Sequence, residues 1–190
     1  MLLKDYVFWD RGVPTDVCDQ IVKHGTGQPS MHGEIAGHNI NKDIRDSDIG
    51  WLKASWILDW IKEPALRANR DIFKYNLTSL EDIQFTKYTP GQHYDWHMDM
   101  GNEEISNESR KLSMIVSLTD PSEYEGGELE FQSLRSSPEG DSKIPPITKD
   151  KFKDKGTIMF FPSVIWHRVK PITKGIRYSL VGWWGGPLFT

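Results

Sequence analysis

Apolar and polar residues alternate in short runs from residue 83 to near the end of the chain, and many of these runs are bounded by Gly, Pro, Asn or Asp. Alternation with a period of two, combined with β-branched and aromatic residues, is typical of half-buried strands. The pattern predicts strands at 83–89, 94–99, 111–118, 128–131, 157–161, 165–169 and 176–184. Their number and spacing favour a jelly-roll barrel, a double-stranded β-helix closed by two sheets.

The chain before residue 83 has helical rather than alternating spacing over much of its length. Residues 14–24 form a short amphipathic pattern, with Thr15 or Asp16 available as the N-cap. Residues 28–50 are polar and punctuated by Gly, which indicates a loop that contains a strand.

Residues 51–75 have apolar positions that suit a helix laid against a sheet. Pro64 interrupts this pattern, and a proline is best tolerated in the first turn of a helix, so we expect a second helix that starts there and runs to Phe73. The fold class is therefore mainly β with N-terminal helices (α+β), the helices packing on one outer face of the barrel. We expect one domain over residues 1–190, with residues 1–82 as helical support and residues 83–185 as the jelly-roll core.

Composition agrees with a compact enzyme-sized domain. Hydrophobic residues make up 37% of the chain and aromatic residues 12%, with eight Trp, so large rings should form much of the core. A net charge of −4 and a pI near 5.9 argue against a protein that covers nucleic-acid phosphates. No apolar run approaches the roughly 20 residues that span a bilayer. The single cysteine, Cys18, excludes an internal disulfide framework and favours the cytoplasm.

Two histidines and an aspartate form a candidate metal site. In an extended segment, residues two apart point to one side, so His97 and Asp99 would face one cavity with Met98 turned away. His167 begins a β-prone segment and could meet this pair across a sheet. Each histidine alone is more often a packed or solvated residue, but together with Asp99 they form the donor set that holds one face of Fe(II) and leaves other positions open.

A second candidate site follows on the next predicted strand. Pro171 to Gly175 indicates a connection, after which a strand returns, so His167 and Arg177 should lie on neighbouring antiparallel strands. Arg177, Ser179 and Trp183 then share one face. A buried Arg needs an anion, and no acidic residue follows Arg177 in the chain. A dicarboxylate ligand that pairs with Arg177 and accepts from the Ser179 hydroxyl would meet that need.

Five segments in this order resemble the prolyl 4-hydroxylase-type members of the Fe(II)/2-oxoglutarate-dependent dioxygenases. The resemblance extends motif by motif over about residues 83 to 185. The segments that carry it are Tyr88-Thr89-Pro90-Gly91-Gln92-His93-Tyr94-Asp95-Trp96-His97-Met98-Asp99, Gly126-Gly127-Glu128-Leu129-Glu130-Phe131, Gly156-Thr157-Ile158-Met159-Phe160-Phe161-Pro162, His167-Arg168-Val169-Lys170-Pro171 and Arg177-Tyr178-Ser179-Leu180.

The resemblance implies that His97, Asp99 and His167 ligate iron. It also implies that Arg177 pairs with the distal carboxylate of 2-oxoglutarate and that Tyr88 hydrogen-bonds this cosubstrate from the opposite strand. The cofactors would be Fe(II), 2-oxoglutarate and O2, with ascorbate as a reductant, and the reaction would convert 2-oxoglutarate to succinate and CO2 while a C–H bond is hydroxylated.

The chain departs from several animal members of this family, which carry a Tyr on the strand after the first two ligands. Here that strand offers Ser113 and Ser117 on its alternating face, which leaves the hydrogen bonding of the cosubstrate open. Tyr94, Trp96 and Trp183 are candidate walls of the substrate pocket, although a Trp is more often a core residue.

The resemblance points to a prolyl residue of a protein or peptide as the substrate, with another side chain or a free small molecule as alternatives. From a different class, the barrel could be a cupin-like metal-binding module without turnover. Arg177 argues against that reading, because a binding module has no need of a dicarboxylate anchor. The loops Met100–Arg110 and Gln132–Lys155 would close over a peptide or be plain connections. The oligomeric state is open.

Overall fold

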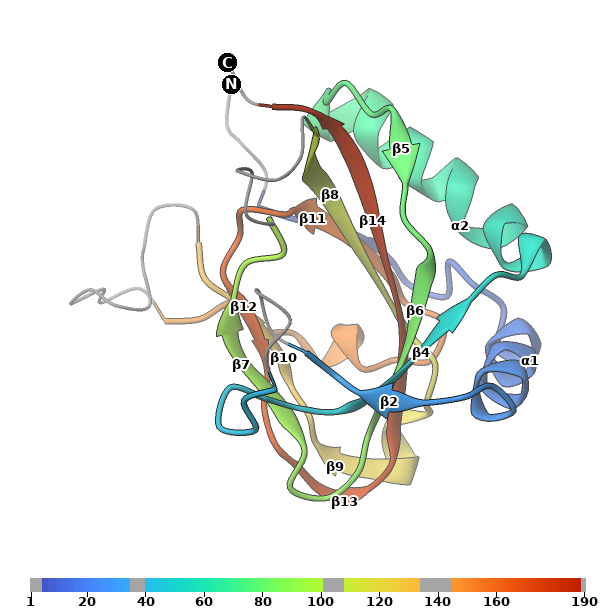
Figure 1. The fold of residues 1–190 in the computed structure, drawn as a ribbon, viewed down its shortest axis with the longest axis vertical. Coiled ribbons are helices and arrows are strands. Elements are labelled where there is room, and N and C mark those ends of the chain that lie inside the picture. The colour runs from blue at the N-terminus through green and yellow to red at the C-terminus, as the bar shows by residue number, and fades with distance from the viewer. Residues whose placement is uncertain (1–4, 35–39, 101–107, 134–144, 189–190) are drawn as a thin grey trace.

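The computed structural model describes residues 5–34, 40–100, 108–133 and 145–188. Figure 1 shows a mainly β molecule with two longer helices, α1 (Thr15–Thr26) and α2 (Ser55–Ala68). Short helical turns are η1 (Asn69–Phe73), η3 (Pro121–Glu123) and η4 (Asp150–Phe152). The strands are β1 (Val7–Trp9), β2 (Met31–His32), β3 (Arg45–Asp46), β4 (Asp48–Leu52), β5 (Ser79–Leu80), β6 (Ile83–Tyr88), β7 (His93–His97), β8 (Glu108–Ser117), β9 (Tyr124–Gly126), β10 (Leu129–Phe131), β11 (Ile158–Pro162), β12 (His167–Val169), β13 (Ile172–Gly175) and β14 (Arg177–Pro187).

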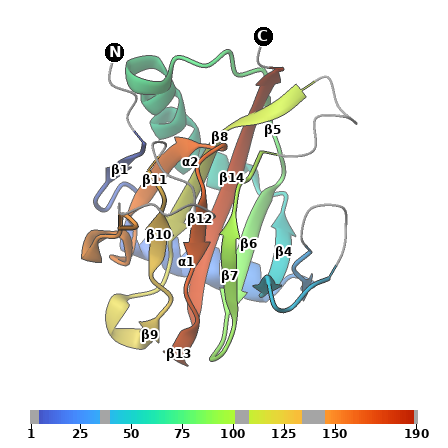
Figure 2. The same ribbon diagram turned by 90° about the vertical axis from the view of Figure 1, so that its left-hand side faces the viewer.

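Two antiparallel sheets form the barrel. The larger sheet has the strand order β1-β11-β8-β14-β6-β4-β2, with β5 paired to β14, and the smaller sheet has the order β10-β12-β7-β3. Figure 2 shows the smaller sheet in front of the larger one. The expected jelly-roll class, mainly β with helices, is confirmed.

The two sheets enclose a core that is rich in aromatic rings, as composition predicted. Phe131 of β10 packs edge-on against Phe161 of β11, with ring centroids 4.9 Å apart, and against Phe152 of η4 at 5.7 Å. All three side chains are essentially inaccessible to solvent. Phe161 also packs against the ring of His167 at 4.7 Å, so this core borders the cavity between the sheets.

Both helices cover the outer face of the larger sheet (Figure 1). The buried stripe of α2 consists of Ile57, Ile61, Ala65 and Ala68, each 0% exposed, at the spacing that places them on one side of a helix. These residues belong to the same apolar cluster as Phe85 of β6, so the expected packing of helices on one outer face is confirmed.

The helix boundaries correct three expectations. Pro64 lies inside α2 and does not begin a second helix, because the apolar stripe continues through it and its burial outweighs the lost backbone hydrogen bond. Trp51 belongs to β4, so the helix starts only at Ser55. Helix α1 has Pro14 at its N-cap without a side-chain cap, so neither Thr15 nor Asp16 fills that role.

The strand after β12 also differs from the expected path. His167 of β12 and Arg177 of β14 were expected on neighbouring strands, but they lie in different sheets. The segment predicted as a simple connection forms β13, which pairs with β9 in a separate two-stranded sheet. The chain therefore crosses from the smaller to the larger sheet between these two residues. The N-terminal region, residues 1–82, contributes β1 to β5 to the sheets in addition to its helices.

The two long loops are described only in part. Residues 101–107 and 134–144 lie outside the described residues, so closure over a substrate stays a prediction. Residues 108–110 belong to β8 and not to a loop. In the second loop, Ile147 forms an isolated antiparallel bridge with Phe131 of β10. This bridge attaches the end of the loop nearer to β11 to the smaller sheet.

Candidate metal and cosubstrate site

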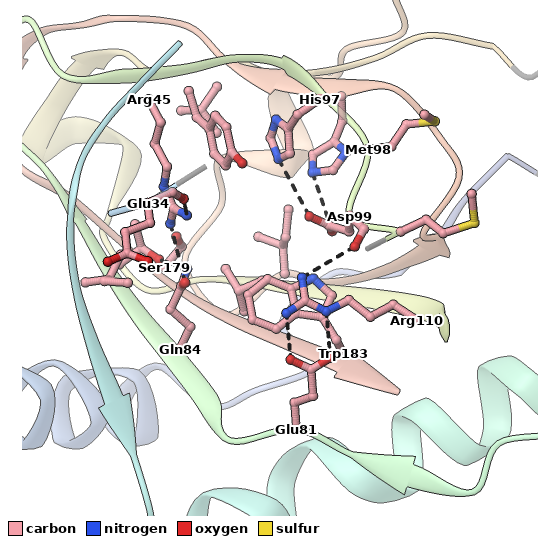
Figure 3. A pocket seen from close by; sticks show the side chains of 18 of the residues that line it. Glu34, Arg45, Glu81, Gln84, His97, Met98, Asp99, Arg110, Ser179 and Trp183 are labelled. Carbon is pink, nitrogen blue, oxygen red and sulfur yellow. Dashed lines mark hydrogen bonds and ion pairs between the residues drawn. The ribbon is translucent and has the colours of Figure 1, made fainter. Parts of the chain in front are cut away.

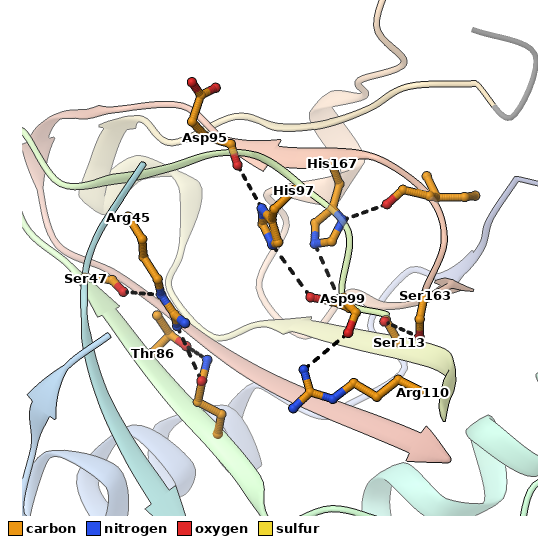
Figure 4. Close-up of polar contacts among 12 residues, drawn as sticks. Arg45, Ser47, Thr86, Asp95, His97, Asp99, Arg110, Ser113, Ser163 and His167 are labelled. Atoms are coloured by element: carbon orange, nitrogen blue, oxygen red, sulfur yellow. Dashed lines mark hydrogen bonds and ion pairs between the residues drawn. The ribbon is translucent and has the colours of Figure 1, made fainter. Parts of the chain in front are cut away.

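Adjacent strands of the smaller sheet bring the two histidines together. His97 ends β7 and lies directly opposite His167 of β12. Asp99 follows two residues after the end of β7, so the pair His97 and Asp99 does not share one strand as expected. The Nε2 atoms of His97 and His167 lie 3.6 Å from Oδ1 and 3.6 Å from Oδ2 of Asp99, respectively (Figure 4). One ligand atom of each residue falls within 4.8 Å of the others.

The outer nitrogens of both rings are held by backbone carbonyls. Nδ1 of His97 lies 2.8 Å from the oxygen of Asp95, and Nδ1 of His167 lies 3.0 Å from the oxygen of Ile165. A proton on Nδ1 donates to each carbonyl and leaves the lone pair on Nε2. Both lone pairs then point toward Asp99.

Protonation states in the cluster suit metal binding. Burial, assisted by nearby His167, holds the pKa of His97 well below its ordinary value, so the ring is neutral. Burial alone would raise the pKa of Asp99, but His167 and His97 outweigh it and the pKa is lowered, so the carboxylate is ionised. Within the described part of the chain, buried Oδ2 of Asp99 accepts no hydrogen bond. Two imidazole nitrogens and a carboxylate oxygen fit Fe(II).

The larger sheet supplies the opposite wall of the cavity. Arg177 of β14 is 3% exposed and lies directly opposite Tyr88 of β6, with its guanidinium carbon 5.6 Å from the Tyr88 ring centroid. Nη1 of Arg177 donates to Oγ of Ser179 at 3.3 Å. Among the described residues Arg177 has no ion pair with a carboxylate. A buried positive charge needs an anionic partner, so a guanidinium whose protein contacts are all neutral can bind an anion.

Tyr124 of β9 is a further contact of Arg177 that the sequence did not suggest. It is buried, its ring lies beside the same Gly127 as the Arg177 side chain, and burial raises the pKa of its phenol although the charge of Arg177 opposes the shift. The nearby Gly127 has a φ of +63°, and a Cβ there would approach Cδ of Arg177 to 3.1 Å. The Gly126-Gly127 pair was the available signal, because such a pair marks a close approach of the backbone to another group.

The serines of β8 do not supply the cosubstrate contact that the sequence left open. Ser117 donates to the backbone oxygen of Phe152 at 2.6 Å, and Ser113 pairs with Ser163, Oγ to Oγ, at 2.9 Å. Neither serine lines the cavity.

The cavity between the sheets has a volume of about 850 Å³. Its walls include all three candidate ligands and the inward face of β14, namely Arg177, Ser179, Val181 and Trp183, as alternation predicted. Figure 3 shows Arg110 between Trp183 and Glu81, below Asp99 in this view. Arg110 donates two hydrogen bonds of 2.6 Å to Glu81 and stacks 4.0 Å above the Trp183 ring.

Arg45 of β3 lines the same cavity and lies 4.6 Å from the Tyr94 ring centroid. Sequence reasoning missed the inward orientation of Arg45 and Arg110, because an Arg in a strand usually faces solvent.

A β-bulge changes which side chains of β7 face the cavity. Between the pairs His167–His97 and Val169–Tyr94, one residue of β12 opposes two residues of β7. Tyr94 therefore stacks on His97, with ring centroids 3.4 Å apart, and lines the cavity. Trp96 does not line it as expected, because the bulge turns it outward beneath the guanidinium of Arg168 at 4.7 Å. Met98, expected to turn away, lines the cavity.

Comparison with known proteins gives a consistent picture. A family model described as the 2OG-Fe(II) oxygenase superfamily matches residues 83–185. A PKHD-type hydroxylase of Synechococcus sp. (strain CC9902) is 36% identical over 104 residues, which are 55% of this chain and 41% of that protein. A PKHD-type hydroxylase of Crocosphaera subtropica is 33% identical over 166 residues, which are 84% of this chain and 65% of the relative.

Among solved structures, the viral collagen prolyl hydroxylase of Paramecium Bursaria Chlorella virus-1, in complex with 2OG, superposes with a TM-score of 0.69 at 22% identity. That match covers 97% of each chain. The chain spans less than two thirds of the length of the curated relatives above. Within the described residues, no helix is both long and apolar enough to cross a bilayer.

Proposed function

The chain belongs to the 2OG-Fe(II) oxygenase superfamily, and we propose that it hydroxylates a prolyl residue of a protein or peptide while 2-oxoglutarate is converted to succinate and CO2. One observation supports the cosubstrate above all. Arg177 is buried without an acidic partner among the described residues, and it lines the same cavity as the three candidate ligands.

His97, Asp99 and His167 would hold the iron. Iron bound there supplies the activation of O2 for attack on an unactivated C–H bond. The carbonyls of Asp95 and Ile165 orient both imidazoles. Burial keeps the His97 ring neutral and the neighbouring histidines keep Asp99 ionised, so these two donors are ready without proton loss at neutral pH.

The larger sheet would bind and orient the cosubstrate. The planar fork of Arg177 would pair with the distal carboxylate, while Ser179 accepts a hydrogen bond that holds the guanidinium in place. Tyr88, directly opposite on β6, closes the side of this subsite, and its phenol stays protonated because burial raises its pKa. With its distal carboxylate at Arg177 on the larger sheet, 2-oxoglutarate would have its oxo-acid end toward the smaller sheet and the proposed metal site.

A polypeptide substrate is favoured over a small molecule by the character of the cavity wall. Met31, Trp51 and Met98 line the cavity yet remain 53%, 38% and 38% exposed, which provides apolar surface beyond the catalytic end. The indole N–H of Trp183 is buried and has no hydrogen-bond partner among the described residues. Trp183 lines the cavity, so this N–H can donate to a carbonyl of a bound substrate, while Arg110 covers one face of the ring.

The test is succinate formation from 2-oxoglutarate with Fe(II) and O2, measured with and without a proline-containing peptide. Ascorbate, proposed as a reductant, is varied in parallel. We expect slow uncoupled succinate formation that the peptide stimulates, with a mass gain of one oxygen atom on the peptide. Absence of succinate under all conditions would refute the reaction. Succinate formation without peptide oxidation, with a free amino acid oxidised instead, would refute the substrate.

A further inference from the structure

Three arginines line the described part of the cavity, and two of them have a counterpart. Arg110 forms its ion pair with Glu81. Arg177 is the proposed partner of the distal carboxylate of 2-oxoglutarate. Arg45 of β3 is only 7% exposed, and no carboxylate of the described residues lies within ion-pair distance of its guanidinium. A buried charge is costly unless an opposite charge accompanies it, so Arg45 is the cavity arginine whose charge still needs an anion.

Neutral oxygens hold the guanidinium of Arg45. Nε donates to Oγ of Ser47 at 3.1 Å (Figure 4), Nη1 to the backbone oxygen of Glu34 at 2.7 Å and Nη2 to Oε1 of Gln84 at 3.4 Å. The amide of Gln84 is itself oriented, because its Nε2 donates to Oγ1 of Thr86 at 2.8 Å. A guanidinium carries more N–H groups than these bonds use, and each terminal nitrogen keeps one for a further acceptor.

The backbone at Gly33, just after β2, leaves the space that the guanidinium occupies. A Cβ at this position would come within 2.5 Å of Nε and 2.9 Å of Cζ of Arg45. The N–H of Gly33 also donates to the backbone oxygen of Ser47 at 2.8 Å, which ties this segment to the chain after β3. The protein is therefore shaped around one position of the Arg45 side chain.

Arg45 lies between the open side of the cavity and the proposed metal site. Its guanidinium carbon is 4.6 Å from the ring centroid of Tyr94, and that ring stacks on His97 at 3.4 Å. Its partner Gln84 lies opposite Trp51 of β4, which lines the cavity and is 38% exposed. An anion bound at Arg45 would therefore belong to a molecule that extends from the open side toward the metal site.

The anchoring points of Arg45 and Arg177 on β6 are well separated. Arg45 contacts Gln84, whereas Arg177 lies opposite Tyr88. Gln84 and Tyr88 are four residues apart on β6, which is about 13 Å at the rise of a strand. The anion that Arg45 needs is therefore distinct from the distal carboxylate proposed at Arg177.

We propose that Arg45 binds a carboxylate of the substrate near the residue that is hydroxylated, so that the protein prefers acidic peptides. This inference rests on the proposed function, because it takes the substrate to be a polypeptide. The carboxylate can come from an Asp or Glu side chain or from the C-terminus of the peptide. Both sources present the same pair of oxygens to the guanidinium.

The experiment is a calorimetric titration of peptides into protein loaded with Mn(II) and 2-oxoglutarate under nitrogen, which measures binding without turnover. One peptide carries Glu on both sides of a central proline and its counterpart carries Gln, and both have an amidated C-terminus. The Glu peptide should bind wild-type protein about 10- to 100-fold more tightly, because it forms charged hydrogen bonds in a buried site. Arg45→Gln should bring the two Kd values within twofold of each other. A third peptide, with Gln beside the proline and a free terminal carboxylate, tests the second source.

Arg168→Gln is the matched control. Arg168 pairs with Glu130 at 2.7 Å and lies outside the cavity lining, so its loss should preserve the preference for the Glu peptide. The Kd for 2-oxoglutarate is also measured in Arg45→Gln and should stay within twofold of wild type. A loss of 2-oxoglutarate affinity as large as the loss for the Glu peptide would place Arg45 in the cosubstrate site and overturn the proposal.

Gly33→Ala moves the guanidinium of Arg45 while its charge is kept. The methyl group would meet the far ends of the Arg45 and Ser47 side chains and not the backbone, so the fold can absorb it. This variant should lose most of the preference for the Glu peptide at a melting temperature near that of wild type. If Arg45→Gln does not fold, Gly33→Ala decides: a lost preference supports the anion site, and a full preference refutes it.

The outcomes separate this inference from the proposed function. Wild-type protein that binds all three peptides equally well would refute the anion site and leave the polypeptide substrate intact. Wild-type protein that binds none of them would refute the polypeptide substrate itself. A preference for the peptide with the free terminal carboxylate alone, abolished by Arg45→Gln, supports the proposal and identifies the terminus as the source.

Discussion

Replacement of Arg177 by Lys tests the cosubstrate site most directly. Lysine keeps the positive charge but loses the planar fork that matches a carboxylate with two parallel hydrogen bonds. Arg177 is 3% exposed, so water cannot readily replace the lost donor. A hydrogen bond to a charged group contributes about 1.5–3 kcal/mol, and about 1.4 kcal/mol is a tenfold change in affinity. We expect the Kd for 2-oxoglutarate to rise roughly 10- to 100-fold.

The assay is calorimetric titration of 2-oxoglutarate into Mn(II)-loaded protein under nitrogen, with the Kd for Mn(II) measured separately. The metal affinity should stay near that of wild type, because Arg177 lies on the other sheet from His97 and His167. Arg168→Lys is the control. Arg168 is adjacent to His167 but pairs with Glu130 at 2.7 Å, outside the cavity lining. A Kd for 2-oxoglutarate within twofold of wild type in Arg177→Lys would refute the role of Arg177.

Four further predictions follow from the structure. Alanine at any one of the three proposed metal ligands should abolish succinate formation and weaken Mn(II) binding at least about tenfold; near wild-type turnover would exclude that residue. Ser179→Ala should raise the Kd for 2-oxoglutarate about 3- to 10-fold, because it removes the hydroxyl that accepts a hydrogen bond from Arg177 and a hydrogen bond contributes about 0.5–1.5 kcal/mol; an unchanged Kd would show that Ser179 does not orient the guanidinium. Pro64→Ala should raise the free energy of unfolding in urea by about 1–2 kcal/mol. A proline inside a helix destabilises the folded state by about 3 kcal/mol, but it also lowers the entropy of the unfolded chain, which offsets about 1 kcal/mol of that cost; a loss of stability in the variant would contradict this account. Burial raises the pKa of the Cys18 thiol from 9.0 to about 12. The stability that the neutral thiol contributes is therefore complete below pH 9 and is lost as the pH rises toward 12. A thiol reagent at pH 8 should label Cys18 only after unfolding, and rapid labelling of the native protein would contradict its burial.

The candidate ligands could be proposed from sequence because their chemistry is carried by residue type and order. His97, Asp99 and His167 needed only to be recognised as a donor set, and the structure brings them within 4.8 Å of one another. Arg177 could be proposed for a similar reason, because a strand with period-two alternation fixes which of its side chains share a face. Neither inference required the pairing of the strands.

The pairing of the strands and the β-bulge in β7 could not be predicted from the sequence. Nothing local shows that the chain changes sheets between His167 and Arg177, since a Pro- and Gly-bounded segment can be a hairpin loop or, as here, β13. The bulge in β7 adds a residue without a sequence marker, so Tyr94 and not Trp96 faces the cavity. Tyr124 was missed because its contact with Arg177 depends on tertiary structure alone.

The placement of the proposed metal ligands and of the proposed acid-binding residues on separate sheets has a consequence for protein engineering. The imidazoles belong to β7 and β12, whereas Arg177 and Tyr88 belong to β14 and β6. Residues without shared partners respond to substitution almost independently. The anion-binding strands could therefore be redesigned to accept a shorter or longer keto acid while the iron-binding strands are left as they are. A library restricted to the inward positions of β6 and β14 would search cosubstrate preference without repeatedly losing the metal.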